Sequence, residues 1–126
     1  MRILLPIIGA ALLLGCTAGG GIEADRAALA NARPVGEPTD CVTLSSISRT
    51  RVRDDRTIDF FLRDGRVFRN RLRHHCAGLG FEESFSYETS LPRLCSVDLI
   101  RVRTPSGLQG GACGLGSFQQ IEIAGR

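Results

Sequence analysis

Residues 57–72 have the sequence TIDFFLRDGRVFRNRL, two short runs on either side of Asp64-Gly65. Apolar side chains recur at alternate positions in both runs. An Asp-Gly pair between two alternating runs is the strongest short-range signal for a β-hairpin. This stretch therefore predicts a pair of antiparallel strands at 57–62 and 66–72, each with one apolar face.

The same pattern continues along the chain from Cys41 onward. Short β-like runs are divided by turn residues about every ten positions, without a helical period. The six expected strands are 50–53, 57–62, 66–72, 83–89, 96–103 and 118–123. They predict a mainly β fold, a small antiparallel sandwich or a partly open barrel.

Alternation gives each expected strand an apolar and a polar face. On the polar face arginine predominates, at Arg51, Arg53, Arg69, Arg71, Arg101 and Arg103. Planar guanidinium groups suit phosphate and carboxylate ligands, so this arginine face is a candidate anion-binding surface. The alternative is a solvated face with cross-strand Arg–Asp pairs, which the small formal net charge of +3 favours.

The N-terminus has the order of a secretory signal. Arg2 is followed by an apolar run at 3–14 and then by Gly15-Cys16. Twelve helical residues span about 18 Å, less than the roughly 30 Å of a bilayer's hydrocarbon core, so a transmembrane helix is not expected. A buried core helix would carry polar residues at helical spacing, and this run has none.

The position of Cys16 directly after a small residue resembles the lipobox of bacterial lipoproteins. The resemblance implies that residues 1–15 are a signal peptide and that Cys16 carries lipid, including palmitate. Several acyl chains give a stable tether, so the membrane is an expected partner. Thr17, where an Asp would favour the inner membrane, implies an outer-membrane protein facing the periplasm. A plain cleaved signal is the alternative. Nucleic acid is not expected in this compartment.

Residues 16–40 are expected to be the acylated N-terminus and a flexible or partly helical tether. Glycines at 19–21 and prolines at 34 and 38 flank an alanine-rich stretch with little apolar surface to bury. Residues 41–126 then form a single β domain, which is all that a chain of this length accommodates.

Four cysteines follow the expected anchor: Cys41, Cys76, Cys95 and Cys113. An even number in a small exported domain predicts two disulfides, and no C-x-x-C pair indicates a zinc or redox motif. In an up-and-down meander, alternate strand ends lie at opposite poles, which favours Cys41–Cys95 with Cys76–Cys113. This order requires all six strands, so the other two pairings stay open.

The chain also resembles a family of small, uncharacterised proteobacterial lipoproteins, classed as a domain of unknown function. The matching residues are Cys41, Val52, Asp55, Thr57-Ile58, Phe60, Asn70-Arg71-Leu72, Cys76, Gly78-Leu79, Phe85, Cys95 and Cys113-Gly114. The resemblance covers approximately residues 34–123. It implies an exported, disulfide-bonded β domain and no catalytic residue.

Candidate catalytic and metal-binding groups are few. In His74-His75-Cys76, neighbours on an extended segment point in opposite directions, so a surface loop is favoured over a metal site or a Cys–His nucleophile. Asp54, Asp55, Asp59 and Asp64 occur in or beside turns, without the spacing of a calcium loop. The glycine-rich stretch 107–116 lacks the context of a phosphate-binding loop and predicts a mobile loop.

These observations predict an envelope lipoprotein with a non-catalytic structural or interaction role and no cofactor. Its partner is expected to be an envelope protein or an anionic envelope polymer. The alternative function is binding of anionic envelope components, namely lipopolysaccharide, phospholipid headgroups or peptidoglycan, through the arginine face. A periplasmic hydrolase using the carboxylates of Glu82-Glu83 and Glu88 is a more distant alternative.

Overall fold

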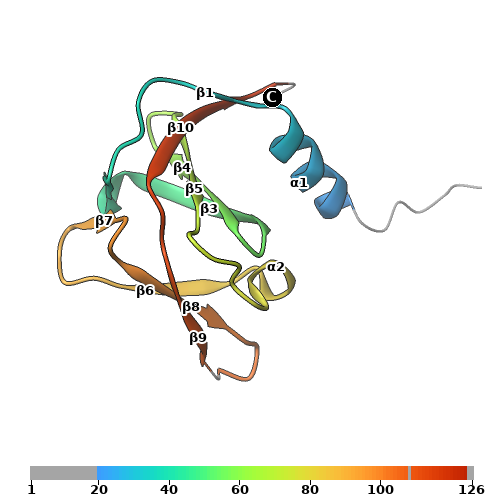
Figure 1. Cartoon of the computed structure of the whole chain (residues 1–126), viewed down its shortest axis with the longest axis vertical. Coiled ribbons are helices and arrows are strands. Elements are labelled where there is room, and N and C mark those ends of the chain that lie inside the picture. The colour runs from blue at the N-terminus through green and yellow to red at the C-terminus, as the bar shows by residue number, and fades with distance from the viewer. Residues whose placement is uncertain (1–19, 108, 125–126) are drawn as a thin grey trace, which may run out of the picture.

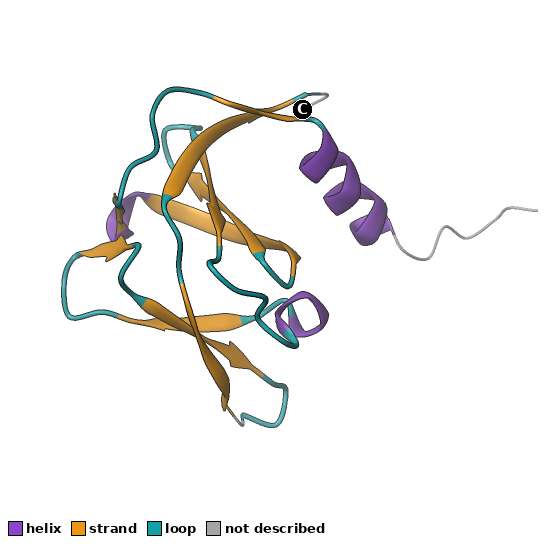
Figure 2. Cartoon of the chain, in the orientation of Figure 1, coloured by secondary structure: helices purple, strands orange, loops and turns teal. Residues whose placement is uncertain are grey.

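The computed structural model describes residues 20–107 and 109–124, and strands dominate it (Figure 1). Two sheets form the layers of the fold, and a short two-stranded sheet flanks them. The two α-helices lie on one side (Figure 2). This arrangement confirms the mainly β, antiparallel prediction. Among the described residues, no helix has the length and apolar character needed to cross a bilayer.

The first layer is a five-stranded antiparallel sheet with the strand order β1-β10-β5-β4-β3. Its strands are β1 (Ala32–Pro34), β3 (Ile47–Asp54), β4 (Thr57–Leu62), β5 (Val67–Arg71) and β10 (Phe118–Ile123). The second layer is a three-stranded sheet with the order β6-β8-β9. It consists of β6 (Phe85–Glu88), β8 (Leu99–Arg103) and β9 (Gln109–Gly114).

Shorter elements connect the layers. The third sheet pairs β2 (Cys41–Thr43) with β7 (Arg93–Cys95), and one turn of 3-10 helix, Leu44–Ser46, follows β2. The helices are α1 (Gly20–Ala30), before the first strand, and α2 (Leu79–Glu82), between β5 and β6.

The β4–β5 hairpin forms where the sequence predicts it, in the centre of the larger sheet. The Leu62 backbone N–H donates to the Arg66 carbonyl at 2.9 Å. Gly65 has a φ of 92°, a left-handed conformation that glycine adopts readily. Backbone and side-chain N–H groups of Arg66 donate to the Asp64 carboxylate, which lowers the pKa of Asp64 below its ordinary value.

The core lies between the two larger sheets. The apolar faces expected on β4, β5 and β8 all point into it, and Phe60 is fully buried at its centre. The Phe60 ring makes edge contacts with Phe118 of β10 and Phe85 of β6, at centroid distances of 5.4 and 6.4 Å. These three rings therefore join the two layers.

Asn70 is a buried polar side chain within this core. Its amide Nδ2 donates to the Gly116 carbonyl at 2.7 Å, and its Oδ1 accepts from the Gly116 N–H at 2.9 Å. The two bonds mimic a strand pairing and give both polar atoms of the side chain a partner. They fix the segment between β9 and β10 against β5.

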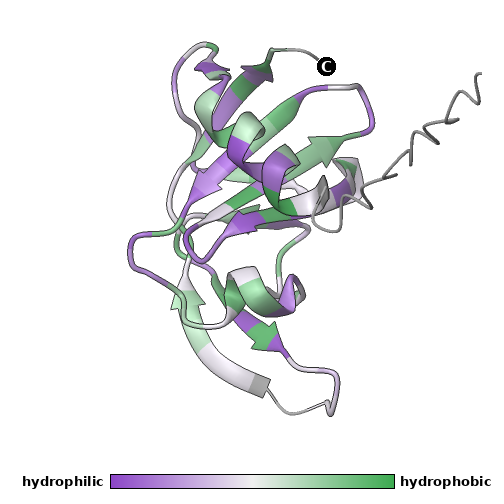
Figure 3. Cartoon of the chain, turned by 90° about the vertical axis from the view of Figure 1, so that its right-hand side faces the viewer, coloured by the Kyte–Doolittle hydropathy of each residue, from purple (hydrophilic) through white to green (hydrophobic). Residues whose placement is uncertain are grey.

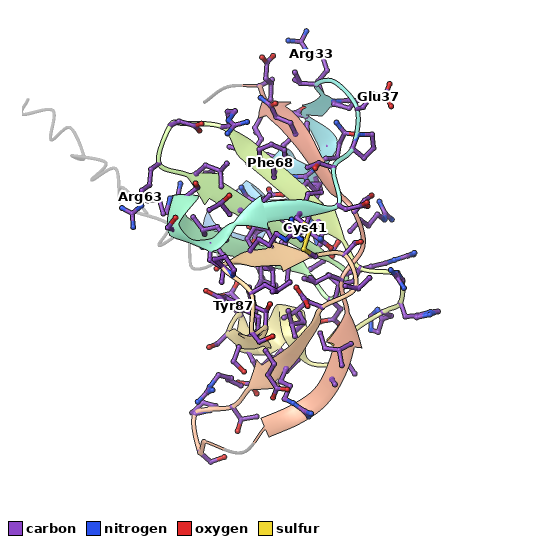
Figure 4. All side chains as sticks on the ribbon, turned by 90° about the vertical axis from the view of Figure 1, so that its left-hand side faces the viewer. Arg33, Glu37, Cys41, Arg63, Phe68 and Tyr87 are labelled. Atoms are coloured by element: carbon purple, nitrogen blue, oxygen red, sulfur yellow. A yellow bond between two sulfur atoms is a disulfide. The ribbon has the colours of Figure 1, made fainter. Side chains whose placement is uncertain are left out.

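Two disulfides fasten the edges of the sandwich, Cys41–Cys95 and Cys76–Cys113. This is the pairing that strand parity favoured. Cys41 and Cys95 are directly opposite each other on β2 and β7, on the side of the molecule away from the helices (Figure 4). Cys76, just after β5, joins the five-stranded sheet to β9 at Cys113.

Residues 16–40 are expected to be the acylated N-terminus and a flexible or partly helical tether; residues 20–40 include the helix α1 but are joined to the sheet, and residues 16–19 with Cys16 lie outside the described residues. Helix α1 packs on the five-stranded sheet and buries Asp25 and Ala28. Strand β1 then pairs with β10, with Ala32 opposite Ile123. Pairing and burial make this segment part of the domain.

The mobile loop expected at 107–116 is wrong. Residues Gln109–Gly114 form β9, which pairs with β8 and places Cys113 opposite Ile100. The sheets are not an up-and-down meander either, because β5 has β10 as its neighbour on the side away from β4. Glycine-rich strands have no apolar alternation, so their pairing partner decides the conformation.

Gly116→Ala tests the close packing beside Asn70. A Cβ at this position would overlap the backbone oxygen of Arg71, which cannot move without disturbing β5. We expect the free energy of unfolding, measured by urea titration, to fall by about 3 kcal/mol. Gly111→Ala is the matched control, since its Cβ would meet nothing within 4 Å. Equal stability of the two variants would contradict this packing.

Candidate functional site

The outer face of the five-stranded sheet carries a row of charged residues on adjacent strands. Arg51 on β3 is opposite Asp59 on β4, and Asp59 is opposite Arg69 on β5. Side chains directly opposite each other on one face are close enough to interact. The arginine face predicted from sequence thus contains a carboxylate at its centre.

Asp59 is fully buried and accepts hydrogen bonds from arginines on both neighbouring strands. Arg69 donates to it from Nε at 2.8 Å and from Nη2 at 2.9 Å. Arg53 donates from Nε at 2.9 Å. A register shift in β3 between Val52 and Asp54 accompanies this contact. Both carboxylate oxygens are therefore paired with cations.

Asp25 of α1 completes the network from above the sheet. It accepts from Arg53 Nη1 at 2.9 Å and from Arg51 Nε at 3.0 Å. The hydrogen bond with Asp25 and the nearby negative charge raise the pKa of Arg51 above its ordinary value. Arg69 Nη2 also donates to the Ala28 carbonyl, at 3.2 Å. The helix thus contacts all three arginines.

The network, defined as Asp25, Arg51, Arg53, Asp59 and Arg69, holds three cations and two anions. Arg53 and Arg69 are mostly covered, and each carboxylate is bound by two arginines. Buried charges are tolerated only when they are paired in this way. The network therefore has a structural role, in which the arginines hold α1 on the sheet.

The six arginines of the predicted face do not share one surface. Arg51, Arg53, Arg69 and Arg71 belong to the five-stranded sheet, whereas Arg101 and Arg103 are on β8 of the other layer. Arg71 and Arg103 are exposed. Arg101 donates to Glu88 at 3.0 Å. The prediction of a continuous arginine face is therefore wrong, because the strands that carry it belong to different sheets.

A groove of about 470 Å³ runs between α1 and the end of the five-stranded sheet. Phe61, Ile123 and three alanines of α1 give it an apolar lining, and Arg49 and Arg51 border it. The Arg49 guanidinium stacks on the Phe61 ring, 3.8 Å from the centroid. Sequence reasoning overlooked Arg49, although it continues the alternation of Arg51 and Arg53.

His74-His75-Cys76 does not form a joint site. Cys76 is buried in its disulfide, while His75 is exposed and lies 3.0 Å from Asp55. Asp55 also accepts from the Gly80 N–H at 2.6 Å and so holds the start of α2. Across residues 20–107 and 109–124, no group of three His, Cys, Asp or Glu side chains is arranged to hold a metal ion.

No family model matches this chain, and neither a curated protein nor a solved structure is found to be similar to it. The likeness to uncharacterised lipoproteins stays a prediction from the sequence. Any function must therefore be argued from the residues themselves.

Asp25→Asn tests whether charge holds α1 in place. Removing the negative charge leaves Arg51 and Arg53 without an anion on the helix, so we expect the free energy of unfolding in urea to fall by about 2 kcal/mol. Amide hydrogen exchange in α1 should rise as well. Glu23→Gln is the matched control on the exposed side of the same helix. If both variants exchange like the wild type, α1 is not held by this network.

Proposed function

We propose that this protein is a lipid-anchored lipoprotein of the bacterial cell envelope with a non-catalytic structural or interaction role. The observation that carries the proposal is the position of Cys16 at the end of a signal-like N-terminus. Arg2 is followed by a short apolar run, then by the small residue Gly15, and Cys16 comes directly after it. Acylation at this cysteine would hold the domain at the membrane. Thr17 favours the outer membrane, with the domain facing the periplasm.

Cysteine pairing supports export. The four cysteines of the β domain form two disulfides, Cys41–Cys95 and Cys76–Cys113. Disulfides persist in oxidising compartments such as the periplasm and are rare in the cytosol. A domain with two disulfides is suited to the periplasm, the compartment to which a lipoprotein signal directs a protein.

The arrangement of charge supports a non-catalytic role. Catalytic acids and bases must be able to exchange protons with a substrate. The buried carboxylates of Asp25 and Asp59 are instead saturated by arginine, and Asp55 is engaged with Gly80 and His75. Glu88, one of the acids considered for hydrolysis, pairs with Arg101. These groups stabilise elements of the fold.

Cys16→Ser tests the anchor. We expect the wild-type chain to incorporate labelled palmitate in its native envelope and to lose residues 1–15, as mass spectrometry of the purified protein would show. The variant should incorporate none, because serine has no thiol for the lipid. Thr17→Ser is the matched control and should be labelled like the wild type. An unlabelled wild type, or a labelled Cys16→Ser protein, would overturn the proposal.

A second candidate function is binding of an anionic amphiphile in the groove beside α1. Its apolar lining suits an acyl chain, and the Arg49 guanidinium at its border suits a phosphate or carboxylate. Lipopolysaccharide and phospholipids have both parts, whereas peptidoglycan lacks the acyl chain. The groove therefore favours lipid-linked anions over peptidoglycan as the ligand in this alternative.

Arg49→Ser tests this groove. Losing one charged hydrogen-bonding group should weaken binding of lysophosphatidylglycerol about tenfold in calorimetric titration. Arg66→Ser is the matched control, since Arg66 also lies over a phenylalanine ring, that of Phe68, but outside the groove. The absence of binding by the wild type, or equal loss in both variants, would exclude the groove as the site.

A further inference from the structure

We propose that the side of the domain formed by α1 and α2 rests on the membrane surface and inserts Phe81 and Ile22 into the lipid interface. Because the anchor at Cys16 is itself proposed, this contact rests on the proposed function. The inference goes beyond the anchor because it identifies the face of the protein that contacts the lipid.

The anchor leaves little freedom between lipid and domain. Cys16 precedes Gly20, the first residue of α1, by four residues. Even a fully extended chain of that length spans at most about 14 Å. An acylated Cys16 would therefore keep the start of α1 close to the lipid headgroups.

Helix α1 cannot swing away from the domain to lengthen this connection. Asp25, in its second turn, is bound to Arg51 and Arg53, and β1 joins the sheet directly after the helix. The short distance between the lipid and Gly20 therefore also limits how far the five-stranded sheet can lie from the membrane. The domain must present the side near the start of α1 to the bilayer.

Helix α2 lies on that same side. Both helices are on the right of the molecule in Figure 1 and face the viewer in Figure 3. Both helices pack against β3. Arg51 of β3 donates from Nη2 to the Gly21 carbonyl of α1 at 3.4 Å, and Asp55, directly after β3, accepts from the Gly80 N–H of α2 at 2.6 Å. The start of α1 and helix α2 are therefore held along the same strand.

This side exposes two large apolar side chains. Phe81 on α2 is 88% exposed, the highest value among large apolar residues of the described chain, and Ile22 on α1 is 64% exposed. Phe81 is displayed on a well-fixed turn, since Leu79 is buried and Gly80 is bonded to Asp55. The free energy falls when aromatic and aliphatic side chains at a membrane surface enter the lipid interface.

The charges around these side chains favour insertion over electrostatic attraction as the main cause of contact. Arg26 and Glu23 on α1, together with Glu83 after α2, are all exposed and of mixed sign. Such a surface gains little from anionic headgroups. The contact is therefore expected to depend on Phe81 and to vary little with salt.

Tryptophan fluorescence tests the orientation, because the natural chain has no tryptophan. The acylated full-length product of each variant is placed in phosphatidylethanolamine–phosphatidylglycerol vesicles that contain brominated phospholipid. Phe81→Trp reports on the proposed contact. Val97→Trp is the matched control: Val97 is 78% exposed in the turn after β7, and β7 lies on the opposite side from the helices (Figure 1). Both must keep the wild-type circular dichroism spectrum.

We expect the Phe81→Trp protein to be quenched several-fold more strongly than the Val97→Trp protein and to emit at shorter wavelength. Equal quenching, or stronger quenching at position 97, in vesicle-bound protein overturns the orientation and leaves the anchor intact. A wild-type chain that is neither acylated nor bound to vesicles overturns the proposed function, and the inference with it.

Discussion

The buried carboxylate of Asp59 is the constraint on which the outer face of the larger sheet depends. A carboxylate with no exposure to water requires cations within hydrogen-bonding distance. Arg53 and Arg69 supply them from the strands on either side. Two arginines on one carboxylate leave excess positive charge, which Arg51 increases. Asp25 neutralises part of this excess, and α1 is thereby drawn onto the sheet.

This dependence explains why the sequence predicts a partly helical tether and not a helix bound to the sheet. Sequence patterns assign a helix to a domain by its apolar face, and α1 has only small or exposed apolar residues apart from the half-buried Leu29. Its contact with the sheet is ionic instead. A single buried acid at Asp25 has no periodicity that distinguishes it from a solvated one such as Glu23. The arginines that fix its position are far away in the sequence.

The elements that could be predicted are those with local signals. Alternation and Asp64-Gly65 identify the β4–β5 hairpin and its buried face, whereas β9 has no such pattern. Its pairing follows from close contact: a Cβ at Gly110 would lie 3.1 Å from Val102, so glycine lets the strand approach β8. The disulfide prediction was right although the meander was wrong, because Cys41 and Cys95 are direct register partners rather than residues at a common pole.

The same ionic contact would determine how the anchor proposed at Cys16 orients the domain. A lipid on a long flexible segment would fix only the compartment of the domain and leave its orientation free. Here the described helix begins four residues after Cys16, and Asp25 joins that helix to three strands through Arg53, Asp59 and Arg69. A force on the anchor would reach the sheet through buried ion pairs, which are costly to open. Acylation at Cys16 would thus set both the location of the domain and the face that it turns away from the membrane, which includes β2 and β7 with their disulfide.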